Sequence, residues 1–321
     1  MAQIVAGLSS SHAFALMEPT GWDDNRARNR AMYGKRYGEL PPEQPQTAEE
    51  TDEDIQARYE RIRDAHGHLR RRTEELAPQA LVLVADDQNE NFTDSNLPQI
   101  AIYLGDEFVA TPRGGGEETA YHGEPGLAKA ILHEGVAADF DISMVKRFPN
   151  DKLIAHACGP LLRVIDPTAR IPVVLVFVNA IHVPAPSPAR CYALGQIIRQ
   201  AVEGYTGLER VAICASGGLS HFTGGYPWDD YEGPFAYGAI SEQFDAGILG
   251  QMQEGEGHLL SRLSSKDLID NGEIELRSWI VMLGAIGNTK PEILVYEPFY
   301  RGIMGMGVGF WDLTQVPAAA R

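Results

Sequence analysis

The sequence has few cysteines, few basic residues and no long apolar run. Its three cysteines are too few and too scattered for a disulfide framework or a cysteine-based zinc site, and they fit a reducing cytoplasm; they are Cys158, Cys191 and Cys214. The chain has 27 Lys and Arg against 44 Asp and Glu, which gives a net charge of −17. This charge repels phosphate backbones and anionic membrane surfaces, so we expect neither nucleic acid nor a membrane as a partner.

Signals for export, membrane insertion and nucleotide binding are also missing. No apolar run approaches the roughly 20 residues that span a bilayer, and residues 1–8 lack the basic and apolar regions of a signal peptide. The triple glycine at 114–116 lacks the Lys-Ser/Thr of a phosphate loop and the spacing of a dinucleotide-binding fold. We therefore expect a soluble, cytoplasmic protein that binds no nucleotide there.

Short β-branched runs alternate with helical stretches along the chain. The pattern of a buried strand occurs at 4–8, 80–85, 100–104, 141–145, 172–178 and 211–215. Helical patterns occur at 125–134, 188–204, 241–253 and 257–263, and a further one begins at 273. This alternation predicts an α/β fold with a mostly parallel central sheet flanked by helices on both faces. We expect one domain over residues 1–321.

Residues 20–77 are predicted to form a helical insertion or cap. The segment 22–38 has no clean period and favours a helix only weakly. Thr47 and Glu50 have the spacing of a capping box, and apolar residues at helical spacing follow as far as about Ala77. His66 and His68 lie two apart on this helix and cannot share a face as metal ligands, which favours a solvated surface for both.

Several histidines follow predicted strands. His221 comes after the strand at 211–215 and the turn Ser-Gly-Gly, at the strand end where open α/β sheets bind ligands. His12 follows the strand at 4–8 in the same way, His156 lies between small residues, and His182 lies in a loop stiffened by prolines. Each alone could be a structural or solvated histidine. Two histidines delivered alike from two strand ends favour a shared site.

Carboxylates lie at two comparable places. The strand at 80–85 runs into Asp-Asp-Gln-Asn-Glu-Asn-Phe, which suits a divalent cation or a polar substrate but equally suits a turn. Glu275 begins a strongly apolar helix, where the helix dipole alone favours it. If this carboxylate faces inward it needs a positive partner, such as a divalent metal. The aromatic run at 223–228 suits either the lining of a pocket or a cover for the core.

Four motifs occur in one order along the chain: Ser-Ser-Ser-His at 9–12, the run from Val-Asn at 178–179 to Leu-Gly at 194–195, Ser-Gly-Gly-Leu-Ser-His at 216–221, and Glu-Leu-x-x-Trp at 275–279. Together they resemble the type III extradiol ring-cleavage dioxygenases, the family of the catalytic (beta) subunit of protocatechuate 4,5-dioxygenase. The resemblance continues to residues 300–309.

The resemblance implies a non-haem Fe(II), or Mn(II), held by two histidines and one glutamate, with open positions for the substrate and O₂. The implied reaction inserts both atoms of O₂ to open the ring of a dihydroxylated aromatic or heteroaromatic compound of the catechol, gallate or hydroxypyridine type. His12 and Glu275 match metal ligands, His221 matches the acid/base histidine, and His156 matches a histidine that contacts a substrate hydroxyl.

Three further expectations follow from the resemblance. Arg301 falls in the loop that anchors the substrate, and His182 lies near the same rim. The cap at 20–77 would cover the pocket that a separate small subunit covers in two-subunit relatives, which implies a homo-oligomer, dimeric or tetrameric.

The sequence departs from the family at one ligand. Gln88 stands where the second histidine ligand is expected, and an amide oxygen is a poorer donor to Fe(II) than imidazole. Glu90, two residues on and on the same side of an extended chain, is an alternative ligand. The run Asp-Asp-Gln-x-Glu-x-Phe resembles a methylgallate dioxygenase-like subclass. The remaining alternative is a metal-poor member that acts as a binding or partner subunit, or as a different lyase or hydrolase on the same fold.

Overall fold

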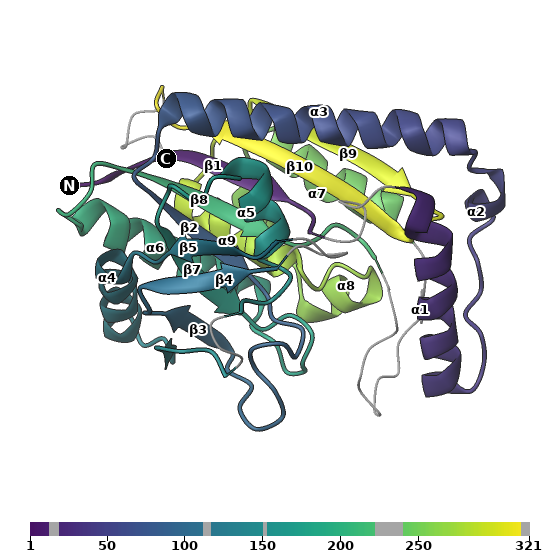
Figure 1. Ribbon diagram of the computed structural model, residues 1–321, viewed down its shortest axis with the longest axis horizontal. Coiled ribbons are helices and arrows are strands. Elements are labelled where there is room, and N and C mark those ends of the chain that lie inside the picture. The colour runs from purple at the N-terminus through teal and green to yellow at the C-terminus, as the bar shows by residue number, and fades with distance from the viewer. Residues whose placement is uncertain (13–18, 112–116, 150–152, 222–239, 316–321) are drawn as a thin grey trace.

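An eight-stranded sheet runs through the part of the chain that the computed structural model describes, residues 1–12, 19–111, 117–149, 153–221 and 240–315. Its strand order is β6-β3-β7-β2-β8-β1-β10-β9 (Figure 1). The strands are β1 (Gln3–Ser10), β2 (Ala80–Ala85), β3 (Ile100–Tyr103), β6 (Ser143–Val145), β7 (Val173–Val178), β8 (Arg210–Ser216), β9 (Ile293–Phe299) and β10 (Met304–Asp312).

The centre of this sheet is parallel and its margins are mixed. The strand pairs β7–β2, β2–β8 and β8–β1 are parallel, as is β3–β6, whereas β3–β7, β1–β10 and β10–β9 are antiparallel. Every residue of β2 and β7 is buried, as expected for parallel strands covered on both faces. The prediction of an α/β fold with a mostly parallel central sheet is confirmed.

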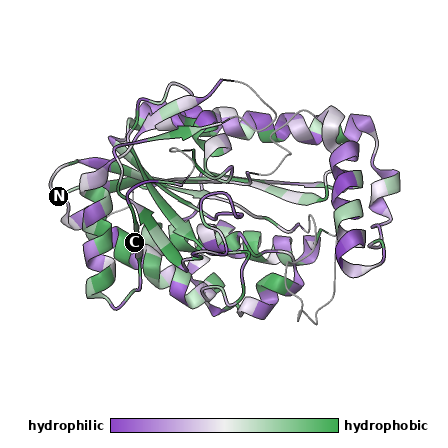
Figure 2. Cartoon of the chain, turned by 60° about the horizontal axis from the view of Figure 1, so that its bottom comes forward, coloured by the Kyte–Doolittle hydropathy of each residue, from purple (hydrophilic) through white to green (hydrophobic). Residues whose placement is uncertain are grey.

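Two helical layers cover the sheet. The alternation along β2 sends Leu81, Leu83 and Ala85 into a core with α3 (Asp52–Leu76) and α5 (Gly159–Ile165). The intervening β2 side chains enter the other core, against α4 (Pro125–Ala137), α6 (Pro188–Gly204) and α9 (Leu276–Ile286). Figure 2 shows the apolar side of these helices turned toward the strands. The second core also includes α7 (Glu242–Gln253), η3 (Gly257–Arg262) and α8 (Ser265–Asp270).

The N-terminal helices form the layer predicted as a cap. The short η2 (Pro19–Gly21) leads into α1 (Trp22–Tyr37), α2 is a single turn (Gln46–Glu49), and α3 lies along β9 and β10 (Figure 1). The predicted capping box at Thr47 and Glu50 is wrong, because Thr51 caps α3 together with Asp54. Glu50 is instead buried and accepts hydrogen bonds from Arg58 and from the backbone N–H groups of residues 300 and 301.

His66 also departs from its prediction. The side chain is 9% exposed, and its Nε2 lies 3.0 Å from the Ser10 hydroxyl at the end of β1. The long helix therefore directs this imidazole toward the sheet. His68, by contrast, lies 2.9 Å from Glu292 at a half-buried position.

The antiparallel elements were not predicted. These are the β9–β10 edge of the sheet and a separate hairpin of β4 (Glu107–Ala110) and β5 (Thr119–His122). His156 was predicted to follow a strand, but it follows only an isolated bridge between Val109 and Leu153. The predicted loops at 114–116 and 223–228 lie outside the described residues. None of the helices described here has the length and apolar character that a membrane span requires.

Candidate metal centre

Three neighbouring strands bring polar side chains to one edge of the sheet. His12 follows β1, Asp86 follows β2, and the turn that leads to His221 follows β8, and these strands are adjacent in the order β2-β8-β1. Glu275 is the N-cap residue of α9, which packs on β8. Because the three strands are parallel, their carboxyl ends meet at the same edge.

His12, Asp86 and Glu275 form a buried cluster. One ligand atom of each lies within 4.8 Å of the others, and the three residues are 2%, 0% and 2% exposed. Among the described residues this is the one group of three such side chains that could hold a metal ion. An imidazole nitrogen and two carboxylate oxygens are donors that suit Fe(II) and Mn(II).

The hydrogen bonds of His12 select its tautomer. The Ser216 hydroxyl donates to the carbonyl oxygen of Ala157, so it accepts from Nδ1 of His12, 3.3 Å away. A proton on Nδ1 leaves the lone pair on Nε2, which lies 3.6 Å from Oε2 of Glu275. This outer hydrogen bond is the arrangement that orients a metal-binding histidine.

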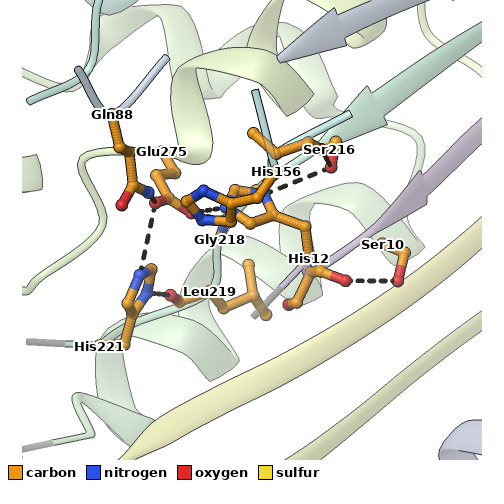
Figure 3. A network of polar contacts seen from close by, with 12 residues as sticks. Ser10, His12, Gln88, His156, Ser216, Gly218, Leu219, His221 and Glu275 are labelled. Carbon is orange, nitrogen blue, oxygen red and sulfur yellow. Dashed lines mark hydrogen bonds and ion pairs between the residues drawn. The ribbon is translucent and has the colours of Figure 1, made fainter. Parts of the chain in front are cut away.

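Glu275 is held by groups on both of its oxygens. Oε1 accepts from the Gln88 amide at 2.7 Å, and Oε2 accepts from the backbone N–H of Gly218 at 3.2 Å (Figure 3). Burial alone raises the pKa of this carboxyl, but in the metal-free protein the positive charges that His12 and His221 carry when protonated outweigh burial and hold its pKa below the usual value. Glu275 is therefore an anion inside the protein, which the sequence left open.

Asp86 differs from Glu275 because no group neutralises it. Both of its buried oxygens lack a hydrogen-bond partner in the described residues. Burial raises its pKa well above the usual value, and the charges of Glu275 and Asp87 raise it further, against a smaller opposing effect of the neighbouring Gln88 amide. Two carboxylates buried this close repel each other, and a divalent cation between them would remove that cost.

The turn after β8 requires glycine. Gly217 and Gly218 have φ values of +134° and +62°, which L side chains rarely adopt. A Cβ atom on Gly217 would lie 2.9 Å from Cβ of Glu275. The Trp279 indole donates to the Gly217 carbonyl at 2.8 Å, so α9 holds the turn in place from below.

His221 approaches a different carboxylate oxygen of Glu275 from the one nearest His12 (Figure 3). Its Nδ1 lies 2.7 Å from the carbonyl oxygen of Leu219, which can only accept, so Nδ1 carries a proton. Its Nε2 lies 3.5 Å from Oε1 of Glu275. Burial acts to lower the pKa of His221, but Glu275 and the Leu219 carbonyl raise it above the usual value.

His156 also reaches this cluster. Its ring lies edge-on to His12, with centroids 5.3 Å apart. Glu90 accepts hydrogen bonds from both the backbone N–H and Nδ1 of His156, at 2.8 and 2.9 Å. Glu90, predicted as an alternative ligand, thus orients His156. Gln88, the other alternative, turns its amide nitrogen toward Glu275 and serves as a donor there.

The two residues predicted to bind substrate lie apart from the cluster's core. His182 is half-buried, lines a small pocket with Asp87, Phe92 and Phe177, and has Nε2 2.8 Å from the Asn89 amide oxygen. Arg301 is bound through all three guanidinium nitrogens to Asp23 and Asp52. The structure thus gives Arg301 a role in joining α1 and α3 to the β9–β10 turn.

Asp86 is the residue that was not singled out from the sequence, although a signal for it exists. Side chains at 80, 82 and 84 enter the core that contains α9, and position 86 continues that alternation toward the start of α9. The sequence signal for Asp86 is therefore an aspartate that continues the buried apolar side of β2.

Comparisons with known proteins place the chain in a family. The family model described as the catalytic LigB subunit of aromatic ring-opening dioxygenase matches residues 42–311. The chain belongs to this family. The prediction of a ring-cleaving dioxygenase family is therefore confirmed.

Two relatives show how far this family member resembles proteins of assigned activity. Gallate dioxygenase of Pseudomonas putida is 34% identical over 31% of the chain, and the match covers 29% of that protein's own length. A 2,3-dihydroxyphenylpropionate/2,3-dihydroxicinnamic acid 1,2-dioxygenase of Klebsiella pneumoniae is 24% identical over 78% of the chain and 91% of that protein. A crystal structure of an uncharacterised Escherichia coli K12 protein matches 95% of the chain with 14% identity and a TM-score of 0.49.

Proposed function

We propose that this family member is a metal-dependent extradiol dioxygenase, which inserts both atoms of O₂ to open the ring of a catechol, gallate or hydroxypyridine type of substrate. The observation that carries the proposal is the convergence of His12, Glu275 and His221, from positions far apart in the sequence, on one buried cluster. The two relatives named for gallate and for 2,3-dihydroxyphenylpropionate support the substrate class.

The residues of the cluster fit a divalent metal. Fe(II), or Mn(II) in its place, would be held by Nε2 of His12 and by the Glu275 carboxylate, and both side chains are preoriented by outer hydrogen bonds. When bound, the ion supplies Lewis acidity toward the substrate hydroxyls and a binding position for O₂. The orphaned buried oxygens of Asp86 in the same cluster support the proposal of a bound cation.

His221 would act as the acid/base. Its Nδ1–H is fixed by the Leu219 carbonyl, so Nε2 is the atom that takes up a proton from a substrate hydroxyl and returns it as the ring opens. Glu275 and the Leu219 carbonyl together outweigh burial and raise the pKa of His221 above the usual value.

His156 would bind the substrate hydroxyl. Glu90 accepts from Nδ1–H of His156, which leaves the lone pair of Nε2 as an acceptor for an O–H group. His182, which is half-buried beside Asn89, would contact a part of the substrate that extends away from the metal. For the cap at 20–77 we propose the role of a built-in cover, within a homo-oligomer of this cytoplasmic protein.

His221→Phe tests the proposal. Loss of an acid/base histidine lowers turnover by about 10²–10⁴-fold. We expect this loss in oxygen uptake with 2,3-dihydroxyphenylpropionate or gallate, while the metal content of anaerobically purified protein stays at one ion per chain. Glu242→Gln, on the adjoining helix α7 and outside the cluster, is the control that should keep wild-type turnover.

Other outcomes would contradict the assignment. Parallel loss of metal and turnover in His221→Phe would make His221 a ligand. Wild-type protein that binds no metal would support the alternative of a metal-poor binding or partner subunit, or of a different lyase or hydrolase. Gel filtration of the chain alone tests the homo-oligomer.

A further inference from the structure

We propose that Asp86 is the third protein ligand of the metal, so that this centre is built from one histidine and two carboxylates. The inference rests on the proposed function and deepens it, because it names the ligand that replaces the histidine missing at Gln88. Asp86 is 0% exposed, and one of its oxygens lies within 4.8 Å of the ligand atoms of His12 and Glu275.

In the part of the chain that the structure describes, the oxygens of Asp86 lack the partners that a buried carboxylate needs. A buried carboxylate normally accepts several hydrogen bonds, and leaving it without them costs about 1–3 kcal/mol or more for a charged group. Neither oxygen of Asp86 has such a partner in the described residues. Glu275 differs, since each of its oxygens accepts one hydrogen bond. Asp86 therefore has free coordination capacity, and unlike Glu273, whose oxygens are also unpartnered among the residues described, it lies in the group that could hold a cation.

The other polar side chains that follow β2 are already held by hydrogen bonds elsewhere. The Gln88 amide nitrogen donates to Oε1 of Glu275, so Gln88 acts as an outer partner that holds the ligand carboxylate. Oε2 of Glu90 accepts from both the backbone and the ring of His156. Asp87 accepts from three backbone N–H groups of the following loop, at residues 90, 91 and 92. Within the segment 86–90, only Asp86 has its carboxylate directed into the cluster.

The alternation of side chains along β2 also favours Asp86 as the ligand. Side chains alternate along β2, and positions 80, 82 and 84 face the core that contains α9. Asp86 continues this row at the carboxyl end of β2, one strand away from β8 and opposite the start of α9. Position 88, where the family histidine is expected, is two residues after Asp86 and so points to the same side of an extended chain. Either residue could therefore fill the same ligand position.

The donor set has a consequence for charge. A divalent ion with two carboxylates and a neutral imidazole has a net charge of 2 − 2 = 0, whereas two imidazoles and one carboxylate leave 2 − 1 = +1. More oxygen donors favour harder ions, and carboxylates suit Mn(II) well. We expect Mn(II) to be a good probe of the site for that reason.

The test is equilibrium dialysis of the full-length protein against Mn(II) alone. Wild type should bind one ion per chain. Asp86→Asn, which keeps the shape of the side chain, should weaken Mn(II) binding by more than about 100-fold, beyond the 10–100-fold that loss of an outer partner costs. Gln88→Leu should fall within that outer-partner range.

Glu273→Gln is the matched control. Glu273 is also 0% exposed and both of its oxygens also lack a hydrogen-bond partner in the described residues, but it lies beside Asp245 and Glu275 without belonging to the group of possible ligands. Removing this buried carboxylate should leave Mn(II) affinity within about 3-fold of wild type, given that context changes such effects by factors of 2–3. Thermal unfolding of the metal-free variants checks that each is folded.

A spectroscopic readout makes the test independent of how the variants fold. X-ray absorption of Mn(II)-loaded wild type should show outer-shell scattering from one imidazole. Two imidazoles, or an unchanged affinity in Asp86→Asn, would overturn the assignment of Asp86 while leaving a metal-dependent enzyme intact. Wild type that binds no Mn(II) and no Fe(II) would overturn the proposed function as well, so the two failures are distinguishable.

Discussion

The buried His66 should make folding stability depend on pH in a way that one substitution removes. Its imidazole is 9% exposed beneath the end of β1, next to Ser10. Burial, with a smaller effect of Arg63, lowers the pKa of His66 to about 4 from an ordinary 6.5. Protonation therefore favours the unfolded chain, in which the imidazole is solvated.

The size of the effect follows from the two pKa values. Each pKa unit corresponds to about 1.4 kcal/mol, so a difference of 2.5 units amounts to roughly 3 kcal/mol of unfolding free energy. The folded pKa is the lower one, so the unfolded state binds more protons. The stabilisation is present in full above about pH 6.5 and is lost as the pH falls toward 4.

The assay is urea unfolding of wild type and His66→Gln from pH 7.5 to 4, in EDTA so that metal binding does not contribute. Glutamine does not titrate, so the wild-type minus variant difference isolates His66. We expect this difference to change by about 2–3 kcal/mol in favour of the variant between pH 7 and 4.5. A difference that stays constant with pH would show that the buried imidazole does not have the lowered pKa on which the reasoning depends.

Three further substitutions test parts of the site. Glu90→Ala should lower kcat roughly 10-fold without loss of metal, a smaller loss than that expected for an acid/base group, because Glu90 orients His156. Glu90→Asp should restore part of the lost kcat. Loss of metal in Glu90→Ala would make Glu90 a ligand. Gly217→Ala should cost about 1–3 kcal/mol of stability and weaken metal binding, because its Cβ would meet Glu275. The control Gly247→Ala, with open space around the new Cβ, should do neither. Equal metal affinity in the two variants would contradict this. Arg301→Met should lower unfolding free energy by roughly 1 kcal/mol with KM unchanged; a raised KM at unchanged stability would return Arg301 to substrate binding.

The parallel half of the fold was predictable because its signals are local. The apolar run at 80–85 forms β2 at the predicted positions, and the helix at 188–204 begins and ends as predicted, with Ser187 as its N-cap. The antiparallel edge was missed since β10 is rich in glycine, and its pairing with β9 and β1 depends on contacts between distant residues. His66 was misplaced because the charged residues around it hide one buried side of a polar helix.

The site was predictable only in part. Histidines after strands and a glutamate at a helix start are visible in the sequence, and the structure brings His12, His221 and Glu275 together. Which of the polar residues after β2 faces the cluster depends on where strand alternation stops and the turn begins. Gln88 and Glu90 were chosen from a likeness in spacing, while the alternation itself points to Asp86.

Isotope labelling tests the central claim most directly. Metal-loaded protein would be incubated under ¹⁸O₂ with 2,3-dihydroxyphenylpropionate or gallate, and the product analysed by mass spectrometry. The account predicts a ring-opened product that contains both labelled atoms, formed by wild type and strongly reduced in His221→Phe. No oxygen consumption with these or other dihydroxylated aromatic compounds, or a product with one labelled atom and an intact ring, would contradict it.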